Sequence, residues 1–260
     1  MRAIPTLKIS ISGVRGVIGQ SLTPTLLTRF AQAFGTYVGS GTIVIGRDTR
    51  TSGEMVRQAV IAGLLSSGCR VIDLDVCPVP TVQLLVRQRK ASGGIAITAS
   101  HNPVEWNALK FIGASGLFLD AAEGAEMRAF LESRIPRATW DKLGTVTTDE
   151  AAIDRHIDQI LALPFLDVAG IRARQFHVAL DTCHGAGVTT FPKLLERLGL
   201  ESARLEALFE RFLQHYNAHI ADESVPFEGM IAALEVLKAA GAKLAALRSA
   251  AWQQVVQRLP

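Results

Sequence analysis

Apolar and polar positions change period several times along the chain, and each change predicts a new element. Residues 7–12 alternate apolar and polar side chains, which is the period of a half-buried strand. Thr23-Pro24 is a strong helix start, and apolar residues then recur on one helical face: Leu26, Leu27, Phe30, Ala31, Phe34 and Val38. Short apolar runs at 42–45, 71–74 and 94–97 predict strands. This alternation favours an α/β fold with a mixed, mostly parallel sheet layered between helices.

The same signals continue along the rest of the chain. Ser52 is expected to cap a helix that ends at Gly68, and a short helix is expected over residues 81–89. Helices are also predicted over 124–131, 150–163 and 191–198, with a strand or linker at 142–148 and a strand at 176–180. We expect residues 1–140 to form a first domain, residues 141–200 to begin a second, and residues 201–260 to form a separate segment.

Composition describes an ordinary globular protein and narrows its partners. The 260 residues are 48% hydrophobic and 20% charged, with a net charge of +3. Lys and Arg are spread along the chain, which argues against nucleic acid as a partner. No apolar run approaches the roughly 18 residues of a membrane helix, and residues 1–8 lack a signal-peptide core. We therefore expect a cytoplasmic protein without membrane contact, whose three cysteines, lacking Cys-x-x-Cys spacing, are reduced thiols.

The stretch with the most chemistry is Thr98-Ala99-Ser100-His101-Asn102-Pro103, at the end of the predicted strand 94–97. A buried parallel strand that ends in a polar loop is where α/β proteins place reactive groups. The loop offers a hydroxyl, an imidazole and an amide, and Pro103 stiffens the turn. The alternative for His101 is a loop histidine that only hydrogen-bonds the backbone.

Two further loops carry arginines. Ser12-Gly13-Val14-Arg15-Gly16 is predicted to be a turn in which the glycines allow positive φ and Arg15 offers a forked cationic donor. Gly46-Arg47-Asp48-Thr49-Arg50 follows the strand at 42–45, and we favour an internal ion pair between Asp48 and an arginine.

Two other candidates have simpler alternatives. Lys110 is separated from Ser100 by one loop and could return to the same pocket, although most lysines are solvated. Asp181 and His184 lie in a glycine-rich loop, 181–187, for which a structural turn is favoured over a metal site.

Four segments in the same order carry a resemblance to a known family: 12–16, 46–50, 98–103 and Asn107-Ala108-Leu109-Lys110. Over about residues 7–200 the chain resembles the α-D-phosphohexomutases, the superfamily of phosphoglucomutase, phosphomannomutase and phosphoglucosamine mutase. Within the superfamily, the sequences of these segments most resemble those of the bacterial phosphoglucosamine mutases. Family members commonly have Asn-Gly-x-Lys where this chain has Ala108, and a turn there tolerates alanine only if its φ is negative.

The resemblance implies a role for each candidate residue. Ser100 would carry the phosphoryl group, Arg15 would face it, and Lys110 would act as the base ahead of His101, which would contact the phosphate or replace Lys110 as base. The resemblance leaves open whether Arg47 or Arg50 steadies the loop or binds the substrate phosphate. The residues expected to bind substrate are Arg47, Arg50, Asn102 and Asn107. Mg²⁺ is the implied cofactor, with the phosphate on Ser100 as one ligand.

The resemblance breaks after residue 200. The family's magnesium-binding Asp-x-Asp-x-Asp-Arg loop and its sugar-recognition and last phosphate-binding domains are not found there. Residues 205–247 instead resemble an internal piece of the phosphoglycolate phosphatases of the haloacid dehalogenase superfamily. Arg248 falls where that family needs a hydroxyl, so we expect no phosphatase function from this piece.

The function expected from this resemblance is that of a phosphohexomutase, an isomerase that uses phosphoserine, in truncated and impaired form. Its substrate would be a hexose or hexosamine phosphate, with glucosamine phosphate favoured, and the resemblance allows a homodimer through the first domain. Two alternatives stay open: a non-catalytic fragment that binds sugar phosphates or pairs with an intact mutase, and a weak sugar phosphatase.

Overall fold

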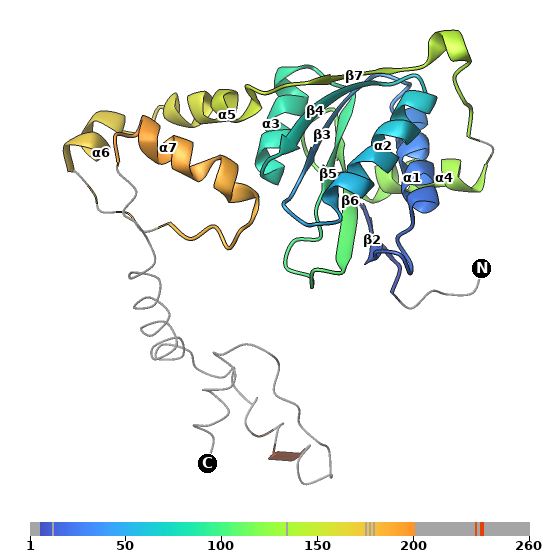
Figure 1. Cartoon of the computed structure of the whole chain (residues 1–260), viewed down its shortest axis with the longest axis horizontal. Helices are drawn as coiled ribbons and strands as arrows, with labels where there is room; N and C mark the ends of the chain where they lie inside the picture. Colours follow the sequence, from blue (N-terminus) through green and yellow to red (C-terminus); the bar gives the residue numbers. More distant parts are fainter. Residues whose placement is uncertain are drawn as a thin grey trace. The chain divides into compact units, whose positions relative to one another are not determined.

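The first part of the chain forms a seven-stranded sheet with helices on both faces (Figure 1). The computed structural model describes residues 6–11, 13–133, 135–174, 176, 178, 180–200, 232, 235 and 236. Residues within Met1–His177 and Thr182–Glu201 belong to one compact unit, and those within Val178–Asp181 and Ser202–Pro260 belong to another. The mixed α/β class expected from the sequence is confirmed.

The sheet has the strand order β1-β2-β6-β5-β3-β4-β7. Its strands are β1 (Lys8–Ile9), β2 (Gly13–Val17), β3 (Thr42–Arg47), β4 (Arg70–Val76), β5 (Gly93–Ile97), β6 (Trp106–Gly113) and β7 (Thr145–Thr148). The pairings of β3 with β5, β3 with β4 and β4 with β7 are parallel. The pairings of β1 with β2, β2 with β6 and β5 with β6 are antiparallel. The parallel and antiparallel parts therefore meet at β5, the strand that leads into the Ser100 loop.

Helices follow the strands much as the periodicity predicts. They are α1 (Pro24–Tyr37), α2 (Gly53–Ser66), α3 (Val79–Gln88), α4 (Ala121–Glu132), α5 (Ala152–Leu161), α6 (Val168–Arg174) and α7 (Phe191–Arg197), with short 3₁₀ helices at Trp140–Lys142 and Ala186–Thr189. Thr23 caps α1 by accepting the Leu26 N–H at 3.3 Å, as expected. Ser52 occupies the N-cap position of α2, as expected, but its side chain makes no capping hydrogen bond.

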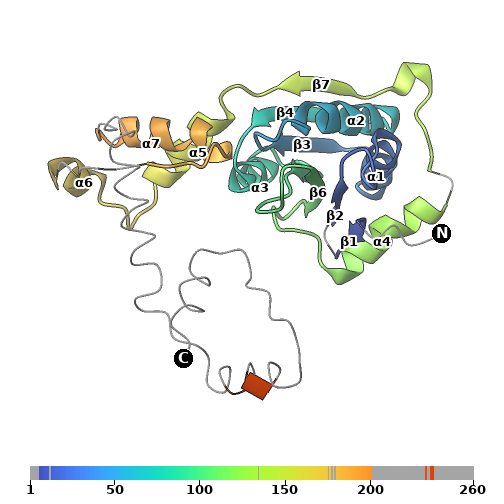
Figure 2. The same ribbon diagram turned by 60° about the horizontal axis from the view of Figure 1, so that its bottom comes forward.

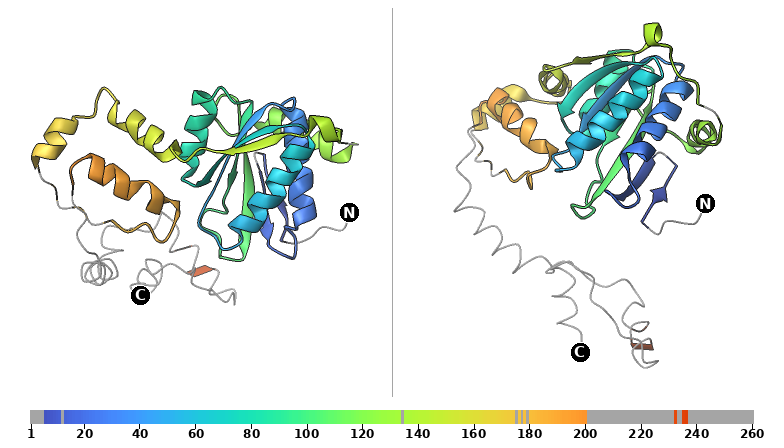
Figure 3. Two further views of the ribbon diagram at one scale, coloured as in Figure 1. Left: turned by 45° about the horizontal axis from the view of Figure 1, so that its top comes forward. Right: turned by 45° about the vertical axis from the view of Figure 1, so that its right-hand side comes forward.

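Two hydrophobic clusters pack on opposite faces of the sheet. Figure 2 and Figure 3 show the helices that cover the sheet from further directions. Successive side chains of a strand point to opposite faces, so Ile95 and Ile97 join the cluster under α1, α2 and α4. Ala96, between them, joins the cluster that contains residues of α3 and α5. In the first cluster the rings of Phe34 and Phe111 lie 5.0 Å apart. This two-sided burial fixes β5 and β6, and with them the ends of the loop that joins them.

The predicted glycine turn at 12–16 is wrong, because residues Gly13–Val17 form strand β2. Neither Gly13 nor Gly16 has a positive φ. A Cβ on Gly13 would lie 2.4 Å from the carbonyl oxygen of Leu109, and one on Gly16 would lie 2.5 Å from Ser21 Oγ. The glycines therefore allow close approach within the fold, and Arg15 projects from a strand.

Three further predictions concern the strand expected at 176–180, the cysteine thiols and the absence of a membrane helix. Of the predicted strand at 176–180, only residues 176, 178 and 180 are described. Cys69 and Cys77 are buried, and burial raises the pKa of these thiols to about 11 and 12. None of the described helices is both long and apolar enough to cross a membrane.

Candidate active site

The Ser100 loop, residues 98–105, joins β5 to β6 at the carboxyl end of β5. The chain is buried from Gly93 to Ala99 and first becomes exposed at Ser100. Ser100 has a φ of 55°, in the left-handed region that is uncommon for serine. Its N–H donates to Thr98 Oγ1 at 3.1 Å. The fold thus presents the Ser100 side chain at the surface on a locally defined turn.

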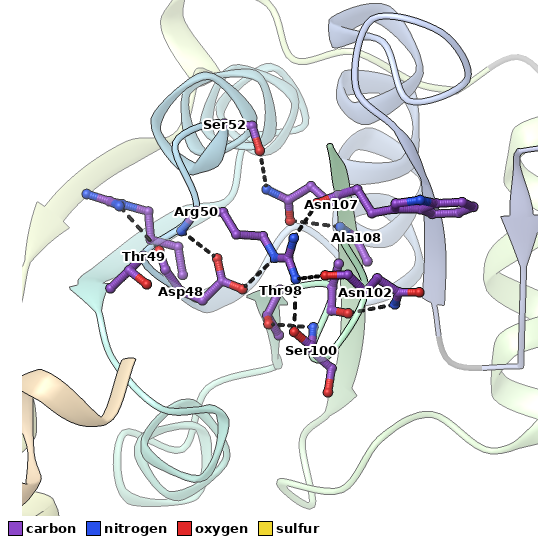
Figure 4. A network of polar contacts seen from close by, with 12 residues as sticks. Asp48, Thr49, Arg50, Ser52, Thr98, Ser100, Asn102, Asn107 and Ala108 are labelled. Atoms are coloured by element: carbon purple, nitrogen blue, oxygen red, sulfur yellow. Dashed lines mark hydrogen bonds and ion pairs between the residues drawn. The ribbon is translucent and has the colours of Figure 1, made fainter. Parts of the chain in front are cut away.

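Arg50 lies at the centre of the contacts that hold this loop (Figure 4). Its Nη2 donates to the carbonyl oxygens of Ser100 (2.9 Å) and Asn102 (2.7 Å). Its Nη1 donates to the carbonyl oxygens of Pro103 (2.7 Å) and Trp106 (3.0 Å). One guanidinium group therefore connects both ends of the Ser100 loop.

Asp48 orients this guanidinium. Its Oδ2 accepts the Nε–H of Arg50 at 3.2 Å, and its Oδ1 accepts the Arg50 backbone N–H at 3.1 Å. The backbone N–H of Asp48 donates to the carbonyl oxygen of Ile97, the last residue of β5, at 3.0 Å. Both side chains are largely buried, and the internal ion pair expected from the sequence is confirmed.

His101 and Asn102 follow Ser100 but differ in their contacts. His101 is exposed, and its Nδ1 lies 3.5 Å from Ser100 Oγ. The Asn102 backbone N–H donates to the carbonyl oxygen of Ala99 at 3.1 Å, and its side-chain Nδ2 donates to the same oxygen at 2.7 Å. The imidazole is therefore beside the Ser100 hydroxyl, whereas the amide of Asn102 bonds back to the loop.

Arg15 and Lys110 project from the same face of the sheet. Arg15 on β2 pairs directly with Ala108 on β6, and Lys110 is two residues further along β6. The N–H of Thr98 donates to the carbonyl oxygen of Ala108 at 3.1 Å. The Arg15 backbone is thus two strand spacings, about 10 Å, from Thr98. Arg15 is exposed, and Lys110 is half-buried with its Nζ 5.8 Å from the Phe118 ring centroid.

Ala108 lies within strand β6 and has no positive φ, so the turn expected at this position is wrong. Its side chain is buried. The condition on which alanine is tolerated in place of glycine, a negative φ, is therefore met by an extended strand.

Arg47 and Asn107 lie in the scaffold around the loop. Arg47 Nη2 pairs with Asp75 Oδ1 at 2.8 Å, and its Nε is 3.9 Å from Glu54 Oε2. Asn107 is fully buried, and its Nδ2 donates to Ser52 Oγ at 3.0 Å. These contacts are internal to the protein, and the substrate-binding roles expected for both residues stay predictions.

Two contacts at the site were missed by the sequence analysis. The Thr98 side chain accepts the backbone N–H of Ser100, a local hydrogen bond that is typical of Ser and Thr. The position of Thr98 at the end of a predicted strand was a signal from which this contact could have been predicted. Thr49 Oγ1 donates to the carbonyl oxygen of His184 at 2.5 Å, across 135 residues of sequence, and no local signal predicts that contact.

The described residues do not build a magnesium site by themselves. Among them, no group of three or more His, Cys, Asp or Glu side chains is arranged to hold a metal ion. A cation site expected around a phosphate on Ser100 would need ligands beyond these described groups.

Comparison with known proteins places this site in a family. The chain matches the family model "Phosphoglucomutase/phosphomannomutase, alpha/beta/alpha domain I" over residues 7–136, half of its 260 residues. The chain therefore belongs to the phosphoglucomutase/phosphomannomutase family. The matched range contains the Ser100 loop, Arg15, Lys110 and the Asp48–Arg50 pair.

Relatives agree with this placement. The chain is 36% identical over 196 residues to a Methanopyrus kandleri protein assigned as a phosphoglucosamine mutase, covering 75% of this chain and 42% of that protein. It is 36% identical over 236 residues to the phosphoglucomutase/phosphomannomutase of Thermococcus kodakarensis, covering 88% and 50%. A solved structure from Thermus thermophilus, assigned as a phosphomannomutase, matches with a TM-score of 0.67 at 26% identity, covering 85% and 53%.

The extent of these matches bears on the segment after residue 200. The chain spans about half the length of the curated relatives it matches. An alignment over 88% of the chain extends past residue 200, because the first 200 of 260 residues are about 77%. The expected resemblance of residues 205–247 to a haloacid dehalogenase-type phosphatase finds no support in these matches. Apart from residues 232, 235 and 236, that segment lies outside the described residues.

Proposed function

We propose that this chain is the phosphoryl-carrying part of a phosphohexomutase. The enzyme would move a phosphoryl group between the 1- and 6-positions of a hexose or hexosamine phosphate, with Ser100 as the carrier. The observation that supports this proposal most is the Ser100 loop, in which a buried strand ends in an exposed hydroxyl on backbone held by Arg50. Membership of the family supports the proposed reaction class.

The proposed chemistry passes the phosphoryl group through Ser100 in two directions. A hydroxyl oxygen of the sugar phosphate bonds to phosphorus as the bond from phosphorus to Ser100 Oγ breaks, and the hydroxyl proton passes to a base. The bisphosphate then turns over, and Ser100 Oγ takes its other phosphoryl group. Such a transfer needs positioning and neutralisation of charge more than covalent chemistry.

The residues near the loop have proposed roles in this step. Arg15 is proposed to neutralise the phosphate on Ser100 with its forked donors. Lys110 is proposed as the base, with His101 as a phosphate contact or alternate base. The 3.5 Å separation of His101 Nδ1 from Ser100 Oγ supports a place for the imidazole beside the transferred group.

The proposed substrate, cofactor and partners rest on the family resemblance. Glucosamine phosphate is favoured by the resemblance, while the names of the relatives are divided between phosphoglucosamine mutase and phosphoglucomutase/phosphomannomutase. Arg47, Asn102 and Asn107 remain the proposed substrate contacts, and a homodimer through the first domain remains a proposal. Mg²⁺ is expected from the family, with the Ser100 phosphate as one ligand.

Product analysis tests the proposal. The full chain is incubated with glucosamine 6-phosphate, glucose 6-phosphate or mannose 6-phosphate, a matching 1,6-bisphosphate and Mg²⁺, and the phosphorus NMR spectrum is followed. A 1-phosphate product that is absent with Ser100→Ala is the expected result. Release of inorganic phosphate without isomerisation would contradict mutase activity and favour a phosphatase. A chain that binds the sugar phosphates without turnover would instead favour the non-catalytic alternative.

A further inference from the structure

Every N–H group of the Arg50 guanidinium already has an acceptor within the protein. Arginine offers five such donors in a planar fork. They are matched by Asp48 Oδ2 at 3.2 Å and by the carbonyl oxygens of Ser100, Asn102, Pro103 and Trp106 at 2.7–3.0 Å. No N–H of this side chain is left for a phosphate.

We infer that Arg50 is the positioning residue of the Ser100 loop and not a ligand of the substrate phosphate. This inference rests on the proposed function, since it assigns Arg50 a part in presenting Ser100 to its substrate. It decides between the two roles that the resemblance leaves open for the arginine.

The acceptors explain how one side chain controls the loop. Four of the five are backbone carbonyls, and they span the loop from Ser100 to the first residue of β6. The left-handed backbone of Ser100 is unfavourable for a serine and persists only where the surroundings enforce it. Arg50 holds the carbonyl of Ser100 itself and those of the second and third residues after it. Its guanidinium therefore opposes relaxation of Ser100 to an ordinary φ.

The guanidinium itself has a fixed orientation. Asp48 binds its Nε, while the Asp48 carboxylate also accepts the Arg50 backbone N–H and the Asp48 backbone is bonded to the end of β5. A lysine has a single ammonium group without the planar fork, so it cannot reach the same set of carbonyls. The inference therefore predicts that even the charge-conserving change Arg50→Lys frees the loop.

Hydrogen exchange of the Ser100 loop measures this role without reference to activity. In the full chain, the amides of the peptide that covers residues 98–106 should exchange about tenfold faster in Arg50→Lys than in the wild type, as expected for loss of charge-assisted hydrogen bonds. The matched control is Arg57→Lys, since Arg57 is also part-buried but bonds to Glu54 and Asp73 and not to the loop. The control should leave exchange of this peptide unchanged.

Phosphorylation kinetics give the second readout. With a hexose 1,6-bisphosphate as donor, Arg50→Lys should lower the maximal rate of Ser100 phosphorylation and leave the half-saturating donor concentration within about twofold. A raised half-saturating concentration, with loop exchange unchanged, would overturn the inference and make Arg50 a phosphate ligand. If the wild type accepts no phosphoryl group, the proposed function fails, while the exchange experiment still tests the loop.

A second variant keeps the inference testable if Arg50→Lys does not fold. Asp48→Asn keeps the side-chain shape and all four carbonyl contacts of Arg50 but removes the charge that orients it. It should raise loop exchange, and by less than Arg50→Lys where both fold. Unchanged exchange of the 98–106 peptide in a folded Asp48→Asn protein would count against an anchored guanidinium.

Discussion

At Ser100 the backbone and the side chain have linked roles. A left-handed conformation costs a residue with a Cβ about 1–2 kcal/mol, and here it coincides with the residue whose hydroxyl is proposed to carry the phosphoryl group. Residues held in sparsely populated conformations cluster at functional sites, where the surroundings enforce them. The strain at Ser100 is thus consistent with a loop shaped for chemistry.

Two substitutions at Ser100 separate this strain from the loss of the hydroxyl. Ser100→Ala and Ser100→Gly both remove Oγ, but only glycine adopts a φ of 55° without a steric cost. We expect the free energy of unfolding of the glycine variant to be about 0.5–1 kcal/mol higher than that of the alanine variant. Glycine relieves the backbone strain, but its greater freedom in the unfolded chain offsets part of that gain. Urea denaturation of the two proteins measures this difference. An alanine variant at least as stable as the glycine variant would show that residue 100 is not held in the left-handed region.

At the site, sequence reasoning identified groups whose chemistry is local and missed those whose partners come from the fold. Ser100 and His101 stood out because a buried run ended in a polar loop, and Asp48 pairs with Arg50 only two residues away. The full role of Arg50 could not be predicted, since its acceptors are backbone carbonyls some 50 residues away that carry no residue signature. The burial of Asn107 was likewise hidden, because it depends on which face of β6 turns toward Ser52.

At the scale of elements, most described helices were predicted, whereas helix α6 and one part of the sheet were not. Periodicity located α1 to α3 because their apolar faces repeat over several turns. Strand β6 was not predicted, since Trp106, Asn107 and Lys110 interrupt the apolar pattern expected of a buried strand. Its polar residues lie on a strand because the antiparallel neighbours β2 and β5 hold it on both sides. The same pairing turns the expected glycine turn at 12–16 into β2.

Helices α3 and α5 are joined by a contact that is sensitive to pH. Thr81 Oγ1 and His156 Nδ1 are 2.8 Å apart, and burial lowers the pKa of His156 from its ordinary value of 6.5. The unfolded chain therefore takes up this proton at a higher pH than the folded protein does, and stability falls as the pH drops below about 6.5.

Replacing His156 by asparagine tests this contribution. Asparagine can keep a hydrogen bond to Thr81 but does not titrate, so the variant should lose less stability than the wild type between pH 7.5 and pH 5. Urea unfolding of both proteins at a series of pH values between about 7.5 and 5 measures the free energy of unfolding for this comparison. Parallel curves for the two proteins would show that His156 does not contribute to the pH dependence.

For the molecule as a whole, β7 and α5 belong with the first sheet although they follow the expected domain boundary. The buried carboxylate of Asp149, directly after β7, pairs with Arg89 at 2.6 Å and with Arg155 of α5. Burial alone would raise the pKa of Asp149, but the hydrogen bonds from Arg89 and Arg155 outweigh it and lower the pKa. Residues 145–161 are therefore tied to the sheet, and the domain boundary expected at residue 140 stays a prediction.

The length of the chain relative to its relatives determines which activity is the most direct to test. It spans about half of the curated relatives it matches, and its family match covers the domain that contains the Ser100 loop. Acceptance of a phosphoryl group by Ser100 requires fewer parts than isomerisation of a sugar phosphate. Phosphorylation of Ser100 is consequently a more direct test of the proposed site than isomerisation of a sugar phosphate.

Mass analysis of the full chain after incubation with a hexose 1,6-bisphosphate and Mg²⁺ tests the central claim most directly. The account predicts one added phosphoryl group that survives acid, maps to the peptide containing Ser100, and is absent from Ser100→Ala. Acid stability distinguishes phosphoserine from a phosphate on the neighbouring His101. A chain that stays unmodified, or a phosphoryl group that persists in Ser100→Ala, would contradict the role of Ser100 as the phosphoryl carrier.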